Sequence, residues 1–121
     1  MASHTQKIGL FIEQEALLYL QSQGLKFIDA NFVCKSGEID LIMRDNEVYV
    51  FVEVRYRKIS EFGDGAESVT KTKQSKIIRA SRVYLQEKNL CDKVLCRFDV
   101  IAASDDGQKE ILWVKDAFWP K

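Results

Sequence analysis

The stretch that decides the fold runs from Gly37 to Arg55 and reads GEIDLIMRDNEVYVFVEVR. Its first eight residues begin with a strict polar–apolar alternation, and its last eight are rich in β-branched and aromatic side chains. Both patterns are typical of strands, and the turn-prone cluster Asp-Asn-Glu at 45–47 separates them. The sequence therefore predicts a β-hairpin, and the nearly continuous apolar run around Phe51 indicates a central strand covered on both faces.

The length of the hairpin loop decides which carboxylates face each other. With a four-residue loop at 45–48, Arg44 pairs with Tyr49, and Asp40 lies opposite Glu53 on one face of the sheet. Directly opposed side chains have Cβ atoms about 4.5–5.5 Å apart, so two carboxylates there repel unless a proton or a cation lies between them. A two-residue loop is the alternative, and we expect it to place the two acids on opposite faces.

The sequence on either side of the hairpin completes a single α/β domain over residues 1–121. A helix is expected over 8–23, ending near Gly24, and Glu13 falls inside its apolar arc. The other expected elements are a strand over 26–33, a helix over 69–88 capped by Ser68, and strands over 94–103 and 110–114. The order is α-β-β-β-α-β-β, a mixed β-sheet flanked by helices.

The charge of the chain is balanced overall but not locally. The 121 residues carry 18 basic and 18 acidic side chains, for a net charge of zero. Residues 1–54 have four bases and eight acids, residues 55–88 nine bases and four acids, and residues 89–121 five bases and six acids. Because the middle segment is basic, the zero net charge does not exclude an anionic partner such as nucleic acid.

Composition excludes several other classes of protein. No apolar run approaches the roughly 20 residues that span a bilayer, so we expect no membrane insertion. The three cysteines form no C-x-x-C pair, which argues against a disulfide framework or a zinc cluster and favours a cytoplasmic location. The single histidine, His4, makes a histidine-based zinc site or a Ser-His-Asp triad untenable.

The acids of the hairpin have two interpretations. They could form an ordinary solvated face with cross-strand ion pairs. Glu53, however, lies within the apolar run VYVFVEV, where an unpaired carboxylate is costly to bury. Carboxylate oxygens that converge in a protected cleft suit Mg²⁺ or Mn²⁺, and such an ion can activate water and stabilise charge on a phosphoryl group.

Three blocks of the sequence resemble the YraN family of small bacterial proteins. They read GEIDLI at 37–42, FVEVRYR at 51–57 and CRFDV at 96–100, and the resemblance covers nearly the whole chain. That family is similar in turn to the PD-(D/E)xK nuclease superfamily, especially to archaeal-type Holliday junction resolvases. The superfamily pattern of an Asp, a spacer and acid-x-Lys reads here as Asp40, twelve residues, and Glu53-Val54-Arg55.

The resemblance implies a restriction-endonuclease-like fold and a metal-dependent endonuclease that acts on DNA, with branched DNA among its substrates. It also implies Mg²⁺ or Mn²⁺ as cofactor, a homodimer as a candidate assembly, and Asp40 and Glu53 as metal ligands. Gly9-x-x-x-Glu13 resembles the first-helix acid that completes the metal site in the resolvases. Position 55 departs from the pattern, because it holds an arginine in place of the lysine, and a guanidinium stays protonated and cannot act as a general base.

We therefore assign Arg55 to hold the scissile phosphate and to stabilise the charge that develops on it. The register that opposes the two acids also places Glu38 opposite Arg55, where it would orient the guanidinium. The same arginine favours an alternative function, a non-catalytic nucleic-acid-binding or scaffold protein that retains the nuclease fold. An interaction module unrelated to nucleic acid is a third reading, but it leaves the buried acids unexplained.

Basic residues recur along the second helix. Such a run is usually a solvated face, and Lys76, Arg79 and Arg82 fit that description. Lys73 and Gln74, by contrast, flank Ile77 on the inward side. Cations that contact phosphates give affinity without sequence readout. The candidate nucleic-acid contacts are Arg57, Lys71, Lys73, Gln74 and Lys76.

Two further groups read as structural. The C-terminal aromatics Trp113, Phe118 and Trp119 are expected to be core or surface-anchor residues, and a base-stacking role is the alternative. Asp99, in the block Arg97-Phe98-Asp99, is expected to belong to a structural ion pair.

Overall fold

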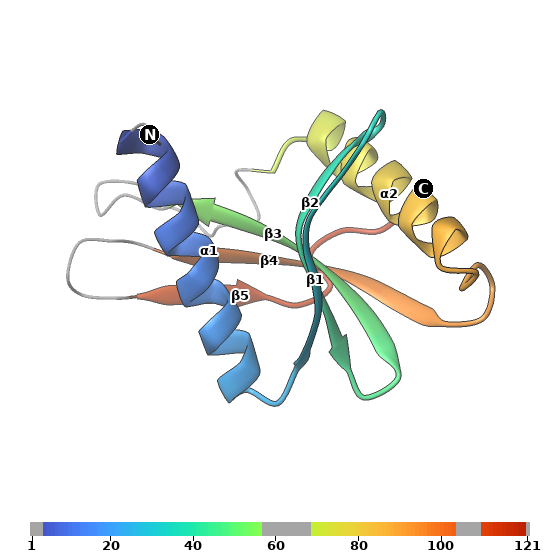
Figure 1. The fold of residues 1–121 in the computed structure, drawn as a ribbon, viewed down its shortest axis with the longest axis horizontal. Coiled ribbons are helices and arrows are strands. Elements are labelled where there is room, and N and C mark those ends of the chain that lie inside the picture. Colours follow the sequence, from blue (N-terminus) through green and yellow to red (C-terminus); the bar gives the residue numbers. More distant parts are fainter. Residues whose placement is uncertain (1–3, 57–68, 104–109, 121) are drawn as a thin grey trace.

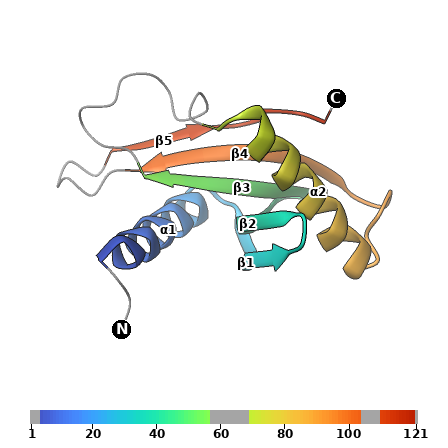
Figure 2. The same ribbon diagram turned by 90° about the horizontal axis from the view of Figure 1, so that it is seen from above.

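The computed structural model describes residues 4–56, 69–103 and 110–120. Its elements are α1 (His4–Ser22), β1 (Lys26–Cys34), β2 (Gly37–Asp45), β3 (Val48–Tyr56), α2 (Lys71–Glu87), β4 (Leu95–Ala103) and β5 (Ile111–Val114). The predicted order α-β-β-β-α-β-β is confirmed, and the five strands form one mixed sheet in the order β1-β2-β3-β4-β5. The β1–β2 hairpin lies between the two helices (Figures 1 and 2).

The hairpin between β2 and β3 has the predicted register but a tighter turn. Arg44 pairs with Tyr49 as predicted, and one further pair, Asp45 with Val48, leaves only residues 46 and 47 in the turn. Asn46 has φ +54°, a left-handed conformation that asparagine tolerates. The expectation that a two-residue loop would separate the acids was wrong, because the loop shortens by one residue at each end and the register is unchanged.

Strand β3 is the central strand that its apolar run predicted. It is antiparallel to β2 and parallel to β4, and the crossover between β3 and β4 contains α2. Phe51 belongs to the apolar cluster on the side of α2, whereas Val50 and Val52 belong to a second cluster that includes Ala16 and Leu20 of α1. Both faces of β3 are therefore covered.

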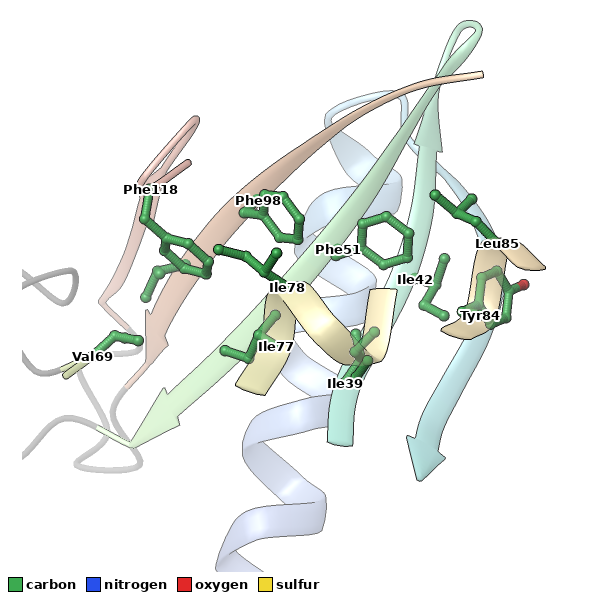
Figure 3. Close-up of a cluster of buried hydrophobic side chains, with 12 residues drawn as sticks. Ile39, Ile42, Phe51, Val69, Ile77, Ile78, Tyr84, Leu85, Phe98 and Phe118 are labelled. Carbon is green, nitrogen blue, oxygen red and sulfur yellow. The ribbon is translucent and has the colours of Figure 1, made fainter. Parts of the chain in front are cut away.

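The cluster beneath α2 is built from stacked aromatic rings (Figure 3). The ring of Phe98 stacks on that of Phe51, with centroids 5.6 Å apart, and on that of Phe118, with centroids 5.3 Å apart. Tyr84 of α2 meets Phe51 edge to face at 6.1 Å. The C-terminal segment is thus anchored to β4 through Phe118, a core residue as predicted.

Helix α2 begins at Lys71, two residues after the start predicted from a cap at Ser68. Thr70 is the N-cap, and its hydroxyl oxygen accepts the backbone N–H of Lys73 at 3.1 Å. Ser68, the residue predicted for this role, lies outside the described residues. The helix then packs closely on the start of β2, since a Cβ on Gly37 would lie only 3.1 Å from the Cβ of Lys76.

A buried ion pair between Asp99 and Arg97 connects β4 to its neighbours in the sheet. Asp99 is fully buried and accepts hydrogen bonds from Arg97, from the indole N–H of Trp113 at 2.9 Å and from the backbone N–H of Asp116 at 3.1 Å. Arg97 also donates to Asp45 at 2.9 Å. The structural role expected for Asp99 is confirmed, because it ties β4 to β5 and, through Arg97, to the β2–β3 turn.

Neither α1 nor α2, the helices of the described segments, combines the length and apolar character needed to cross a membrane.

Replacing Asp99 tests how much this network stabilises the fold. We expect Asp99→Asn to lower the free energy of unfolding by about 3 kcal/mol, because it removes the fully buried carboxylate of the pair and leaves the half-buried guanidinium of Arg97 with Asp45 alone. Urea denaturation measures the loss. Asp116→Asn is the matched control, since that side chain is exposed and only its backbone N–H joins the network. Equal, small losses in both variants would contradict the role given to Asp99.

Candidate functional site

The site begins where β2 separates from β3. The ladder between them covers Leu41–Asp45 and Val48–Val52, and the part of β2 before it pairs with β1, as in Val33 with Glu38. Figure 1 shows the β1–β2 hairpin turning away from β3 toward α2. Asp40 is the first residue beyond the ladder, and its Oδ2 accepts the backbone N–H of Val54 at 2.8 Å. A carboxylate therefore takes the place of a backbone acceptor at the point of separation.

The environment of Asp40 favours its protonated form. The pKa of Asp40 is raised from 3.8 to about 8, first by burial and then by the negative charge of Glu53. The hydrogen bond from Val54 lowers the pKa, and the charges of Glu13 and Glu38 raise it further. Asp40 accordingly lies within electrostatic range of Glu13, Glu38 and Glu53.

Glu53 is the deepest of these acids and is paired with cations. Its side chain is only 3% exposed, and its Oε1 lies 2.7 Å from the Nζ of Lys73 and 3.8 Å from Nη1 of Arg55. Lys73 comes from the first turn of α2, on the inward side that the helical periodicity predicted. Helix α2 thus brings the ammonium group of Lys73 into contact with the buried carboxylate of Glu53.

Glu13 approaches the cluster from α1. Burial raises its pKa, and the charges of Glu38 and Glu53 raise it further, so its predicted position in the inward arc of the helix places it near the other acids. With its amide nitrogen turned toward the acid, Asn31 donates to both carboxylate oxygens of Glu13 at 3.3 Å.

The sequence did not identify Asn31 as part of the site. Asparagine is depleted in strands, so in the sequence Asn31 argues only against the strand expected over 26–33. In the structure it has φ +56° within β1, near the irregularity between Phe27 and Asp29. An asparagine in the middle of a predicted strand was the available signal.

The structure does not bring all of the remaining predicted site residues to the acid cluster. Glu38 is exposed and pairs with Val33, so the ladder that would oppose it to Arg55 does not extend that far. The amide of Gln74 donates to the backbone carbonyl of Val69 at 3.0 Å. Lys71 and Lys76 are exposed on α2, and Arg57 lies outside the described residues. The roles of all these residues in binding or catalysis stay predictions.

The acids do not form a ready-made metal cage. Over residues 4–56, 69–103 and 110–120, no group of three or more histidine, cysteine, aspartate or glutamate side chains is arranged to hold a metal ion. Asp40 is engaged by Val54, and Glu53 by Lys73. Two half-buried or buried carboxylates, a third acid from α1 and two cations therefore share one region, and the cations balance part of the negative charge.

Comparison with known proteins gives a consistent result over the whole chain. The sequence profile of the uncharacterised protein family UPF0102 matches residues 12–103. A UPF0102 protein of Coxiella burnetii (strain CbuK_Q154) is 50% identical over 117 residues, 97% of this chain and 96% of that protein. UPF0102 proteins of Nitrosococcus oceani and Stutzerimonas stutzeri are 46% and 43% identical, covering 97% and 96% of this chain and 94% and 98% of their own. These names state a family and no activity.

The raised pKa of Asp40 predicts how stability depends on pH. Between 3.8 and about 8 the folded protein binds more protons than the unfolded chain, so its stability falls as the pH rises through this range. The expected loss is on the order of a few kcal/mol. Chemical denaturation in EDTA at a series of pH values measures it. Asp40→Asn should flatten the profile and raise stability at pH 8, whereas Glu47→Gln, in the exposed turn, should leave the slope unchanged. A wild-type stability that rises across this range would contradict the environment described.

The ion pair between Lys73 and Glu53 makes a separate prediction. Lys73→Met should lower the free energy of unfolding by about 1–3 kcal/mol, because Glu53 is left buried without its closest cation. Thermal or urea denaturation at neutral pH measures the effect. Lys71→Met is the control, since it removes an exposed lysine from the same turn of α2. If both variants lose the same stability, Lys73 has no special role at Glu53.

Proposed function

The chain belongs to the UPF0102 family, and we propose that it binds nucleic acid and hydrolyses a phosphodiester bond with a divalent metal ion held by Asp40 and Glu53. The family membership agrees with the resemblance to the YraN family seen in the sequence. The names of its relatives do not describe an activity, so the proposal rests on the site.

One observation carries the proposal. Asp40 and Glu53, from adjacent strands, come together where those strands part, with Glu13 of α1 in electrostatic range and Lys73 of α2 in contact. A solvated face of ion pairs would leave its carboxylates in water, but Glu53 is 3% exposed. Such a gathering of acids and bases beneath the surface is costly to build and is typical of sites that perform chemistry.

The chemistry of these side chains fits a divalent cation. Mg²⁺ and Mn²⁺ prefer oxygen ligands, and Asp40, Glu53 and Glu13 offer carboxylates in excess of the cations beside them. These three residues would hold the ion. When bound, it would supply Lewis acidity toward a phosphoryl oxygen and a lowered pKa for water.

The chain's own residues supply the rest. The hydrogen bond from Val54 fixes the orientation of the Asp40 carboxyl group. Arg55 and Lys73, both at Glu53, would hold a phosphate and stabilise negative charge on it. A guanidinium cannot give up its proton, whereas an ammonium can. Of these two cations, Lys73 would therefore take the role in proton transfer that an arginine at position 55 cannot fill.

A second candidate function, a nucleic-acid-binding protein without hydrolysis, is favoured by a different observation. Asp40 is bonded to Val54 and Glu53 is paired with Lys73, so both acids already have partners within the protein. Such a site is stable without a metal ion, and the fold would then serve only to present cations to the phosphate backbone.

A cleavage assay separates the two functions. The purified protein is incubated with four-way junction, flap, duplex and single-stranded DNA, and with RNA, in Mg²⁺, Mn²⁺ or EDTA. We expect metal-dependent cutting that Asp40→Asn or Glu53→Gln reduces by more than about 100-fold, since even outer-shell changes at metal sites cost about 10- to 100-fold. Glu47→Gln, a matched loss of one acid outside the site, should cut normally.

Three results would count against the proposal. Salt-sensitive binding with no cutting favours the second function, and failure to bind any nucleic acid overturns both. The metal site has its own readout, because an ion that binds only the folded state raises the melting temperature. If Mg²⁺ and Mn²⁺ shift the melting temperature of the wild type and of Asp40→Asn equally, these acids do not hold the ion.

A further inference from the structure

A basic groove lies along one side of α2. Its volume is about 320 Å³, and the C-terminal segment forms its other wall. Lys71, Ser75, Ile78 and Arg82 line it at spacings of three and four residues, so they share one face of α2. Arg79 also contributes, and the described residues that line the groove include no acid. The arginines expected to form a solvated face therefore line a concave surface.

The opposite wall presents an exposed aromatic ring. Trp119 is 56% exposed and lines the groove, whereas its neighbour Phe118 is buried against Phe98. The backbone N–H of Ala117 donates to the carbonyl of Phe98 at 2.7 Å, which fixes the segment just before the tryptophan. An indole so exposed contributes little to the core, yet its support holds it beside three cations.

This combination matches one kind of ligand. Cations along a groove contact successive phosphates, and an accessible indole offers a stacking surface that suits any base. In a duplex the faces of the bases are covered, so stacking on Trp119 requires an unpaired strand. An acidic peptide would satisfy the cations but has no base to place on the indole.

The length and position of the groove fit a strand that leaves the acid cluster. From Lys71 to Arg82 the helix rises about 16 Å, the length of roughly five nucleotides at the spacing of a B-form strand. Lys71 and Lys73 both belong to the first turn of α2, and Lys73 contacts Glu53. Because residues two apart point to nearly opposite sides of a helix, a strand that passes from the acids to the groove would pass around this first turn of α2.

We propose that this groove binds an unpaired nucleic-acid strand, with a base stacked on Trp119 and phosphates on Lys71, Arg79 and Arg82. The inference deepens the proposed function, on whose nucleic-acid binding it rests, because it assigns a substrate that carries a single-stranded or splayed arm. It does not depend on hydrolysis.

The test measures binding in EDTA, where metal-dependent cutting cannot contribute. The probes are a fluorescein-labelled oligothymidylate, the oligouridylate of the same length and the matching DNA duplex, followed by fluorescence anisotropy over a range of salt concentrations. We expect the single strands to bind more tightly than the duplex. Trp119→Ala should weaken that binding about tenfold, the loss usual for one stacked base, whereas Trp119→Phe should retain most of it.

The cations have their own readout. The double variant Arg79→Ala/Arg82→Ala should reduce the slope of log affinity against log salt by about 1.4, since each phosphate contact of a single strand contributes about 0.7. Lys26→Ala/Lys93→Ala removes two exposed cations outside the groove and should leave the slope unchanged. Because Trp119 is exposed, unchanged melting temperatures should show that its variants fold.

Several outcomes would overturn the inference. These are equal binding of Trp119→Ala and wild type, equal loss in the two double variants, duplex binding as tight as single-strand binding, and displacement of the oligonucleotide by polyglutamate of equal charge. Cutting that depends on Asp40 with binding indifferent to Trp119 would leave the proposed function standing and remove only the groove. Binding that depends on Trp119, without any cutting, would support the groove and count against the hydrolysis in the proposed function. A preference between the two single strands identifies DNA or RNA as the source of the strand.

Discussion

Backbone N–H groups in a central strand must find acceptors, and where β2 leaves β3 the acceptor for Val54 is the carboxylate of Asp40. This bond lets the β1–β2 hairpin depart from the sheet without leaving a buried donor unpaired. The departure in turn brings the hairpin between the two helices (Figure 1), so that acids from β2, β3 and α1 converge.

Charge is balanced by elements distant in sequence. The acidic first part of the chain supplies the carboxylates, and the basic middle part supplies the cations that meet them, Arg55 on β3 and Lys73 on α2. The net charge of zero thus reflects ion pairs between the acidic and basic segments inside the fold, as well as the balance of charge on the surface. The ion pair also orients α2, because Lys73 fixes the start of the helix over Glu53, while Thr70 caps the turn that carries it.

Patterns with a clear physical period were sufficient to predict the architecture. Alternation gave the strands and the register, since a hairpin turn admits few pairings, and the 3.6-residue period placed Glu13 and Lys73 inward. Features that depend on three-dimensional context were not predictable in this way. The cap moved to Thr70, and Asn31 was recognised only as a poor strand residue. Trp119 was grouped with Phe118 as a core or surface-anchor residue, because no periodic pattern distinguishes the two aromatic residues. Which of their rings is buried depends on the position of β4.

The absence of a side chain at residue 37 has a consequence for the acids. The start of β2 touches α2 at Lys76, where even a methyl group would lie 3.1 Å from the lysine Cβ. Lys76 is three residues, less than one turn, from Lys73. A larger residue at 37 would push the helix outward and draw the ammonium away from Glu53. The hydrogen atom that stands in place of a side chain at Gly37 therefore helps to set how closely Lys73 and the buried Glu53 approach each other in a different part of the fold.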